Sequence, residues 1–430
     1  MKNAKCILKG VVFSLLIGSA FAQDYDGHIV KFAEGSKAFH DKSFQSLGNI
    51  REIPVSFGNF VHLDATLNQK SLNSLASHPE VEYIEPNYLY SFQPVSVGEV
   101  TEAIEDGKFT DQWGLKNTGD NSGGWFWSGK KGEDINAERA WDITTGSGEV
   151  VVAVIDTGID YNHPDLKENL LVNEAELNGE EGVDDDANGY VDDIYGYNFV
   201  KKSGDPMDGN GHGTHCAGVI GGVHNSEGVR GVMANVKMFG VKFLSDSGSG
   251  STEDAILSID YAVKRGANVL SNSWGGGGRS EALKEAIVRA NEAGVIFVAA
   301  AGNSRADNDS RASFPANYDV DNVISVGAMD GKGKKSGFSN FGKEKVHVFA
   351  PGSNILSTVQ NGRYKKMSGT SMAAPFVSGI AGLLLDQEST LTTGEIRQRI
   401  VDTAVNNSTL IDYAQSGRID AYRTLMNVQD

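Results

Sequence analysis

The chain of 430 residues is long enough to build a large core and more than one domain. Its 38 Lys and Arg residues stand against 56 Asp and Glu residues, which gives a net charge of −18. This balance argues against a nucleic-acid or anionic-membrane partner, and it suits a soluble exported protein that holds cations.

The first 22 residues are typical of a secretory signal peptide. The lysine-bearing start Met1–Lys9 precedes an apolar segment, Val11–Ile17, and an A-x-A cleavage motif, Ala20–Ala22. The apolar segment is too short for a membrane span, and Cys6 precedes it, which argues against a lipoprotein leader. We therefore expect export to the extracellular space or the periplasm. Cleavage leaves Cys216 as the remaining cysteine, so stability must come from packing or metal rather than a disulfide.

Residues 23–92 are expected to form a small α+β unit. Alternating residues predict strands at His28–Phe32, Phe60–Leu63 and Val81–Ile84, and helical spacing predicts a helix at Leu67–Ser77. This unit does not gather a nucleophile, a base and an acid. Residues 93–110 are polar and acidic and lack core-forming periodicity, so we expect an exposed linker that is open to proteolysis.

Residues 111–430 alternate between apolar runs and helical patterns. Buried strands are predicted at Val150–Ile155, Val236–Val241, Val269–Ser273, Val295–Ala301 and Val323–Val326. Helices are predicted at Thr252–Arg265, Ser280–Ala293 and Thr393–Val405. Continuous apolar strands that alternate with helices predict an α/β fold, in which helices cover both faces of a parallel sheet.

One stretch near the C-terminus carries a candidate nucleophile. The segment Gly369–Pro375 precedes an apolar run, Phe376–Leu385, that predicts a buried helix. Ser371 in the first turn lies beside unpaired N–H groups and the positive end of the helix dipole, which favour an oxyanion. In that turn the missing N–H of Pro375 costs nothing. Taken alone, the stretch favours an N-cap serine before a core helix over a nucleophile.

Three further polar residues lie at predicted strand or helix ends. Asp156 ends the first buried strand, His212 begins a small-residue helix, and Asn303 follows the strand that ends at Ala301. His212 can take the proton of Ser371, Asp156 can orient the imidazole, and the Asn303 amide can donate to an oxyanion. We expect Asp156, His212 and Ser371 to meet in one hydrogen-bonded line. Singly, each is an ordinary turn or buried polar residue; together they favour a serine hydrolase.

The motifs Asp156–Gly158, His212–His215 and Gly369–Pro375, in this order, resemble those of the subtilisin-like serine proteases (subtilases). The resemblance covers about Gln112 to Leu425, and it implies a three-layer αβα fold with a mostly parallel central sheet. The α/β-hydrolases use another order of triad residues. Their G-x-S-x-G motif is also absent, because Ala373 stands in place of the second glycine.

The resemblance implies a serine endopeptidase that cleaves peptide bonds through an acyl-enzyme. Ser371 is the expected nucleophile, His212 the base and then the acid, Asp156 the orienting carboxylate and Asn303 the oxyanion donor. Polypeptides are the expected substrates. A catalytically silent homologue that binds peptides in the same cleft is the alternative, although all four chemical positions are filled.

The family also implies where substrate binds. Extended substrate is expected to pair with one strand and to meet an opposite wall, formed by Ser273, Trp274 and Gly275 and by Gly248 to Gly250. The S1 pocket is expected to be lined by Ala300, Ala301, Gly302 and Ser313. With no charged residue among them, we expect a broad or apolar preference at P1.

Residues 23–92 resemble the inhibitor-like I9 propeptide of this family, a small ferredoxin-like α+β domain. The similarity is carried by His28–Phe32 and Val81–Asn87. By analogy, this unit assists folding, caps the active site and leaves after self-cleavage between about Tyr90 and Asp111. The mature enzyme, residues 111–430, is expected to be a monomer. An ordinary accessory domain is the alternative.

An acidic loop at 182–193 predicts a calcium site. The expected ligands follow the spacing of a calcium loop: Asp184, Asp186, Asn188 and the carbonyl of Tyr190. The twelfth position is Tyr195 rather than glutamate, so the loop is not an EF-hand. Related subtilases bind calcium at a similar insertion that later aspartates close, here Asp192 and Asp193. A solvated acidic loop is the alternative.

The family implies a second calcium site around Asp165. Its further expected ligands are the side chain of Asn225, the carbonyls of Val223, Glu227 and Val229, and Gln112. Bound calcium would brace a chain without disulfides. Cys216 lies one turn after His212, and we expect a small buried side chain under the triad rather than the nucleophile of a cysteine protease. Mercurials inhibit some relatives that carry cysteine at this position.

Overall fold

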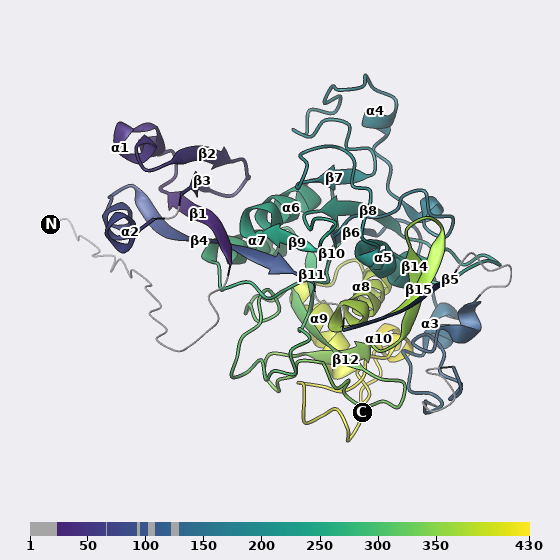
Figure 1. The fold of residues 1–430 in the computed structure, drawn as a ribbon. Helices are drawn as coiled ribbons and strands as arrows, with labels where there is room; N and C mark the ends of the chain where they lie inside the picture. Colours follow the sequence, from purple (N-terminus) through teal and green to yellow (C-terminus); the bar gives the residue numbers. More distant parts are fainter. Residues whose placement is uncertain (1–23, 66, 93–94, 102–107, 122–128) are drawn as a thin grey trace.

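A computed structural model of the protein describes residues 24–65, 67–92, 95–101, 108–121 and 129–430 (Figure 1). The predicted signal peptide, residues 1–22, lies outside the described residues. Within the described part of the chain, no helix combines the length and the apolar character that a membrane span requires.

The N-terminal unit is an antiparallel sheet with short helices, drawn in purple and blue in Figure 1. Its elements are β1 (Tyr25–Phe32), η1 (Ala38–His40), α1 (Lys42–Gln45), β2 (Asn49–Ile53), β3 (Asn59–Asp64), α2 (Gln69–Ala76) and β4 (Val81–Ser91). Phe32, Phe39 and Phe44 lie in its own apolar core. The strand order is β2-β3-β1-β4-β9, and β9 (Ser249–Ser251) belongs to the main domain. The predicted α+β unit therefore shares a sheet with the rest of the chain.

The main domain contains a seven-stranded sheet, and its strand pairs are parallel. In spatial order the strands are β13 (Val348–Pro351), β12 (Val323–Met329), β11 (Ile296–Ala300), β10 (Val269–Asn272), β6 (Val151–Asp156), β8 (Lys237–Lys242) and β7 (Gly196–Asn198). The α/β prediction is confirmed. Short β7 and β13 escaped sequence reasoning, because three or four residues carry little periodicity.

Helices cover both faces of this sheet. The longer ones are α5 (His212–Gly221), α6 (Thr252–Lys264), α7 (Glu281–Glu292), α8 (Thr370–Gln387), α9 (Thr393–Asp402) and α10 (Ala421–Met426). Short turns of helix are η2 (Lys108–Asp111), α3 (Ala137–Trp141), η3 (Lys167–Asn169) and α4 (Glu174–Leu177). Val152 and Val154 belong to the core that contains α5 and α8, whereas Ala153 and Ile155 belong to the core with α6 and α7. This alternation follows the period of two in a strand.

A third sheet of three strands contains part of the predicted linker. It pairs β14 (Ile355–Val359) with β15 (Arg363–Ser368), and β15 in turn pairs with β5 (Ser96–Thr101). Residues 96–101 of the predicted linker, residues 93–110, therefore form a strand that the sequence did not predict. The strand forms because the edge of β15 supplies its hydrogen-bond partners, and such pairing leaves little apolar pattern in the sequence. Residues 93–94 and 102–107 lie outside the described residues.

Candidate active site

An aspartate and a histidine meet at the carboxyl edge of the central sheet. Asp156 is the last residue of β6, and His212 is the first residue of α5. Nδ1 of His212 lies 2.7 Å from Oδ1 of Asp156, and both side chains are buried. The same Oδ1 accepts a hydrogen bond from the N–H of Thr157 at 2.7 Å. A carboxylate in this place holds the imidazole proton on Nδ1 and leaves Nε2 as the basic nitrogen.

Ser371 is the second residue of α8, and its side chain is buried. Its hydroxyl donates to the carbonyl oxygen of Ser273 at 3.0 Å, and Nε2 of His212 has no hydrogen-bond partner among the described residues. The expected unbroken line of hydrogen bonds is therefore not formed in this state. The reason is that the hydroxyl has turned toward Ser273. A hydroxyl turns about one bond, and such contacts commonly tighten only when substrate binds.

Cys216 lies on α5 with His212, and it contacts the segments that carry Asp156 and Ser371. Its Sγ lies 3.4 Å from the carbonyl oxygen of Ser371 and 4.0 Å from Oδ2 of Asp156. Burial raises the pKa of the Cys216 thiol, so at neutral pH it is the neutral thiol and a poor nucleophile. The prediction of a small buried side chain at this place is confirmed.

Pro375 lies deeper in the helix than predicted. Because α8 begins at Thr370, Pro375 is not in the first turn but four residues after Ser371. Here its missing N–H removes the helical hydrogen bond to the carbonyl of Ser371. The hydroxyl of Ser273 at 2.8 Å and the thiol of Cys216 at 3.4 Å donate to that carbonyl instead. The prediction that Pro375 costs nothing is wrong, and two residues from other segments replace the lost donor.

Asn303 is held by its side-chain oxygen. Oδ1 accepts hydrogen bonds from the N–H of Thr370 at 2.9 Å and from its hydroxyl at 3.0 Å. With Oδ1 fixed there, Nδ2 lies near Gly369, and Asn303 lines the same cleft as Ser371. An amide oriented in advance is suited to stabilise negative charge on a substrate oxygen. Sequence reasoning missed Thr370, whose only signal was its place beside Ser371.

A cleft of about 300 Å³ opens beside Ser371. Of the predicted substrate residues it is lined by Ser273, Trp274, Gly275, Ala300, Gly302 and Ser313. Ala301 is not in the lining, because it is fully buried. The exposed Arg311 also lines the cleft, whereas the expectation of an uncharged lining concerned only the S1 residues. The loop between β11 and β12 carries Arg311 to the cleft, which the predicted pocket residues gave no reason to expect.

The chain's own N-terminal unit reaches into this cleft. Ser91 exchanges two backbone hydrogen bonds with Gly275, each of 3.2 Å, and the N–H of Phe92 donates to the carbonyl of Gly248 at 3.3 Å. Antiparallel pairing of β4 with β9 places Tyr90 opposite Gly250. An extended segment therefore lies between the two backbone edges that were predicted to hold substrate.

Two aromatic side chains of this segment are in contact with the main domain. Tyr90 is fully buried, with its ring 5.2 Å from that of Trp274, and its hydroxyl donates to the carbonyl of Gly278 at 3.2 Å. The ring of Phe92 stacks on that of His212 at 4.1 Å with an interplanar angle of 21°. The segment thus places one aromatic ring in a buried pocket and a second on the candidate base.

Asp208 joins the segments that carry Asp156 and His212. Its Oδ1 accepts from the hydroxyl of Thr157 and the N–H of Gly211, both at 2.9 Å, and its Oδ2 accepts from the hydroxyl of Thr214 at 2.6 Å. Burial raises the pKa of Asp208, and these hydrogen bonds oppose that rise. Sequence reasoning missed this residue, although an aspartate just before a predicted helix is a capping signal.

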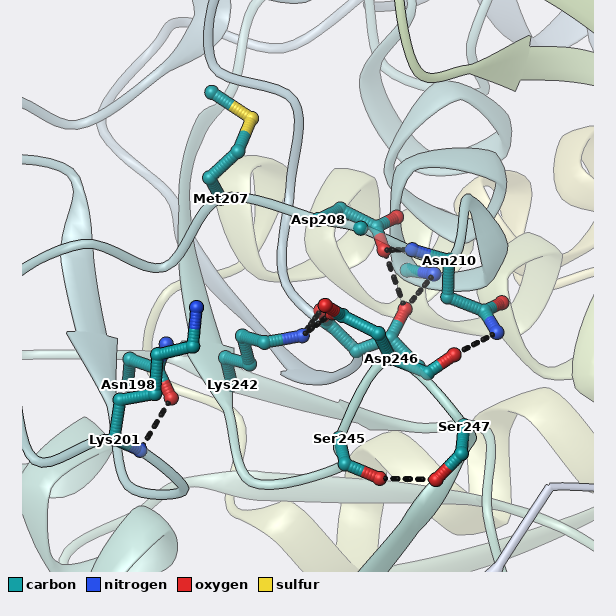
Figure 2. Close-up of polar contacts among 12 residues, drawn as sticks. Asn198, Lys201, Met207, Asp208, Asn210, Lys242, Ser245, Asp246 and Ser247 are labelled. Atoms are coloured by element: carbon teal, nitrogen blue, oxygen red, sulfur yellow. Dashed lines mark hydrogen bonds and ion pairs between the residues drawn. The ribbon is translucent and has the colours of Figure 1, made fainter.

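A buried lysine supports the same segment from the other side. Figure 2 shows Lys242 reaching Asp246, and Asn210 bridging from Asp208 to the Asp246 backbone. The ammonium group of Lys242 donates to Asp246 Oδ1 at 2.7 Å and to the carbonyl of Thr157 at 2.5 Å. Thr157, which follows Asp156, is therefore held through both its side chain and its carbonyl.

The acidic loop brings three carboxylates together. Ligand oxygens of Glu176, Asp184 and Asp186 lie within 4.8 Å of one another. Asp193 is buried, and its Oδ2 lies 2.7 Å from a guanidinium nitrogen of Arg265. The amide of Asn188 links it to the acidic loop, because Nδ2 donates to Asp186 at 3.1 Å and to Asp193 at 3.2 Å. The other predicted ligands are Asn188, Tyr190 and Asp192. Sequence reasoning missed Glu176, because it precedes the loop in a separate short helix, α4.

Both candidate sites have features that suit a cation. Three converging carboxylate oxygens fit Ca²⁺, which prefers oxygen ligands. Asp165 is fully buried, and its hydrogen-bond donors are neutral: the N–H of Val229 at 2.8 Å, the hydroxyl of Tyr364 at 3.0 Å and the amide of Asn225 at 3.3 Å. A buried carboxylate with neutral donors alone fits a neighbouring cation.

Apart from Gln112, the remaining residues predicted around Asp165 lie in one loop at 223–229. Asn225 Oδ1 accepts from the N–H of Glu227 at 2.8 Å, and the N–H of Val223 donates to the Asp165 carbonyl at 2.9 Å. Gln112 instead pairs with the backbone of Arg230, through hydrogen bonds of 2.7 and 2.8 Å. Its side-chain oxygen is therefore engaged by an N–H group.

Comparison with known proteins places this architecture. Residues 147–420 match the model of the subtilase family. The chain is 37% identical to the thermophilic serine proteinase of Bacillus sp. (strain AK1) over 356 residues, which are 82% of this chain and 75% of that protein. It is 37% identical to thermitase of Thermoactinomyces vulgaris over 294 residues, 68% of this chain and 94% of thermitase. It is 39% identical to the halolysin-like extracellular serine protease Nep of Natrialba magadii over 293 residues, 67% of this chain and 50% of that protein.

Proposed function

The chain belongs to the subtilase family and is a serine endopeptidase, and from this premise we propose that Asp156, His212 and Ser371 are its catalytic triad. The observation that carries the assignment is the 2.7 Å contact between His212 and Asp156 beside the cleft that Ser371 and Asn303 line. This cleft also receives an extended segment of polypeptide between two backbone edges.

In the proposed reaction Ser371 attacks the carbonyl carbon of the scissile peptide bond. Its hydroxyl leaves Ser273, its proton passes to Nε2 of His212, and Asp156 stabilises the imidazolium that forms. The amide of Asn303 and the N–H of Ser371 donate to the oxyanion. His212 then protonates the departing amine as the C–N bond breaks. A water molecule hydrolyses the acyl-enzyme with His212 again as the base.

Residues 23–92 are proposed to be an inhibitory propeptide that is removed by self-cleavage. The support is a set of contacts that satisfy helix ends of the main domain. The carboxyl group of Glu85 accepts from the hydroxyl of Ser280 at 2.6 Å and the N–H of Glu281 at 2.8 Å, at the start of α7. Asn87 Oδ1 accepts from the N–H of Glu253 at 2.9 Å in the first turn of α6. Glu85 and Asn87 therefore accept hydrogen bonds from groups at the starts of α7 and α6, where backbone N–H groups have no partner within their own helix.

The proposal extends to calcium and to export. Glu176, Asp184 and Asp186 would hold one Ca²⁺, and Asp165 with Asn225 would take part in a second site. Bound calcium would add stability to a chain whose described cysteine, Cys216, is free.

Export is supported by the signal-like N-terminus and by a relative that is named as extracellular. The enzyme is proposed to act as a monomer after maturation.

Two experiments test this function. A fluorophosphonate probe should label the mature wild-type protein at Ser371 and should leave the Ser371→Ala variant unlabelled. Failure of the mature wild type to label would instead favour a silent peptide-binding homologue. Intact mass and N-terminal sequencing of both proteins should show a shortened wild type and a full-length variant. A variant that shortens equally would show that another protease does the processing.

A further inference from the structure

Asp208 is a buried acidic residue whose hydrogen-bond donors are all neutral. Its exposed fraction is 2%, and within the described part of the chain it forms no ion pair. Oδ1 accepts from the hydroxyl of Thr157 and from the N–H groups of Asn210 and Gly211, each at 2.9 Å. Oδ2 accepts from the N–H of Thr214 at 2.9 Å and from its hydroxyl at 2.6 Å. Figure 2 shows Asp208 beside Asn210, at the start of α5.

The arrangement of these donors favours the ionised form of Asp208. Thr157 Oγ1 already accepts from the N–H of Gly213 at 2.9 Å, and Thr214 Oγ1 already accepts from the N–H of Asp160 at 3.0 Å. Each hydroxyl therefore has its own hydrogen available for Asp208. Burial raises the pKa of Asp208, but a carboxyl proton would point at one of these donors, so the hydrogen bonds oppose protonation.

On one side, Asp208 holds the residue that orients Asp156. The N–H of Thr157 donates to Oδ1 of Asp156 at 2.7 Å, and the hydroxyl of Thr157 donates to Asp208. The carbonyl of Thr157 accepts from the buried ammonium group of Lys242. An anion and a cation therefore hold Thr157 at two of its atoms. The N–H that orients the carboxylate of Asp156 is fixed as a result.

On the other side, Asp208 holds the first turn of α5, which carries His212. The N-cap of this helix is Gly211, which has no side chain to accept from the first N–H groups. Asp208 takes this place, because it accepts from the N–H groups of Gly211 and Thr214. Both partners of the 2.7 Å contact between His212 and Asp156 are thus anchored on one carboxylate.

We propose that Asp208 is a positioning residue for the reaction: it sets the geometry between Asp156 and His212, and its negative charge favours the imidazolium that forms when Ser371 gives up its proton. The inference rests on the proposed triad and deepens it. A carboxylate that only caps a helix adds stability. A carboxylate tied to both partners also determines how well the imidazole accepts a proton, because catalytic rate depends on geometry and charge that are fixed in advance.

The charge of Asp208 acts among other titratable groups around the start of α5. Burial lowers the pKa of His215 to about 3 and raises the pKa of the Cys216 thiol, so both side chains are neutral at pH 7. Removal of the charge of Asp208 leaves the nearby lysines less balanced, which disfavours a cation on His212. The other charged residues beside this turn are Asp156, Asp160, Asp246, Lys242 and Lys365.

The test is the kinetics of mature Asp208→Asn on a chromogenic peptide anilide between pH 5 and 9. Asparagine keeps the shape, removes the charge and turns an NH₂ group toward N–H donors. We expect kcat to fall about 10- to 100-fold with KM within about twofold, because misplaced reacting groups cost rates of this order.

The pH profile of the same variant reports the charge. Without Asp208 the imidazolium is less favoured, so His212 becomes neutral at a lower pH. The acidic limb of kcat/KM should therefore move to lower pH by about 0.5–1 unit. Because Asp208 is buried, this shift should persist in high salt, which screens exposed charges.

Asp420→Asn is the matched control. Asp420 is also buried and caps a helix, since its Oδ1 accepts from the N–H of Arg423 at 2.9 Å at the start of α10. This change should lower the Tm, as Asp208→Asn does, and should leave kcat, KM and the pH profile unchanged. If Asp208→Asn also changes only the Tm, Asp208 is a helix cap and the proposal is overturned.

Two variants of Thr157 keep the test decisive if Asp208→Asn does not fold or mature. Thr157→Val removes the hydroxyl and keeps the charge of Asp208, so kcat should fall about tenfold while the acidic limb stays in place. Thr157→Ser keeps the hydroxyl and should retain the wild-type kcat. Equal kcat in the two variants would refute the link. In Asp208→Asn/Thr157→Val the loss should be close to that of Asp208→Asn alone, and multiplied losses would contradict a shared path.

The wild type separates this inference from the proposed function. If the wild type cleaves the anilide while Asp208→Asn keeps its kcat and pH profile, the role of Asp208 is refuted and the protease stands. If the mature wild type neither reacts with the fluorophosphonate probe nor cleaves the anilide, the proposed function itself fails.

Discussion

The carbonyl of Ser371 depends on two residues from other segments, and this dependence yields a sharp prediction. Pro375 cannot supply the helical N–H, so the hydroxyl of Ser273 and the weak donor Cys216 take its place. Ser273→Ala removes the stronger of the two. A buried acceptor without its partner costs about 1–3 kcal/mol, and the remaining thiol keeps the expected loss at about 1–2 kcal/mol.

Combining Ser273→Ala with Pro375→Ala tests this dependence specifically. This change restores an N–H four residues after Ser371, so the Ser273 hydroxyl becomes redundant. In the Pro375→Ala background, Ser273→Ala should cost only a few tenths of a kcal/mol, which corresponds to a coupling energy of about 1 kcal/mol or more. A loss of about 1 kcal/mol in the free energy of unfolding lowers the Tm of a large domain by about 2–4 °C.

The assay is thermal unfolding of the four variants in the Ser371→Ala background, which keeps the carbonyl and prevents autolysis. The same cycle with Cys216→Ala in place of Ser273→Ala should give a smaller coupling, because a thiol is a weak donor. Additive free energies of unfolding, with coupling below about 0.3 kcal/mol, would show that the carbonyl of Ser371 does not need the Ser273 hydroxyl.

Three further predictions follow from named contacts. Burial raises the pKa of Glu85 to about 7, above its ordinary value. Glu85 therefore holds a proton while the propeptide is bound and gives it up when the propeptide is released. Propeptide binding should weaken as pH rises toward and through 7. The lag before wild-type activity appears should therefore shorten from pH 5.5 to 8, and Glu85→Gln should remove this dependence. Excess EDTA should lower the Tm and speed autolysis, and Glu176→Gln should weaken calcium-dependent protection. Peptides with Tyr and Phe spaced as Tyr90 and Phe92 should be cleaved about tenfold faster than peptides with alanine there.

Each of these predictions has an outcome that contradicts it. A lag with the same pH dependence in wild type and Glu85→Gln would remove that carboxyl from the release step. Melting curves that coincide with and without EDTA would refute calcium stabilisation, and Asp120→Asn, a change in an exposed loop, is the matched control for Glu176→Gln. Equal rates for aromatic and alanine peptides would mean that the contacts of Tyr90 and Phe92 belong to the propeptide alone.

The fold class could be predicted because its signal is periodic and local. Val150–Ile155 shows a continuous apolar run, and the structure places β6 there with alternate residues in the two cores. Helices α6 and α7 begin after Ser251 and Ser280, whose side chains cap them. The candidate site could be located because Asp156, His212 and Ser371 stand at ends of such elements. Their catalytic roles stay a prediction until the labelling experiment is done.

Contacts between distant segments left little or no trace in the sequence. Cys216 reaches the carbonyl of Ser371 across 155 positions, and Glu85 reaches Ser280 across 195. β5 forms because the edge of β15 supplies its hydrogen-bond partners. Glu176 joins an acidic loop from a different helix. No short-range pattern encodes these pairs, since each partner alone is an ordinary polar residue.

The amino-acid order by itself determined where the longer strands of the central sheet and most of its helices form, because hydrophobic period and capping act over a few neighbours. Only the tertiary structure decided how their ends meet: that Ser371 turns toward Ser273, that the chain's own strand crosses the cleft, and that β15 holds the segment beyond it. Hydrogen bonds of this kind depend on position in space, and position in space is set by the packing of the whole domain.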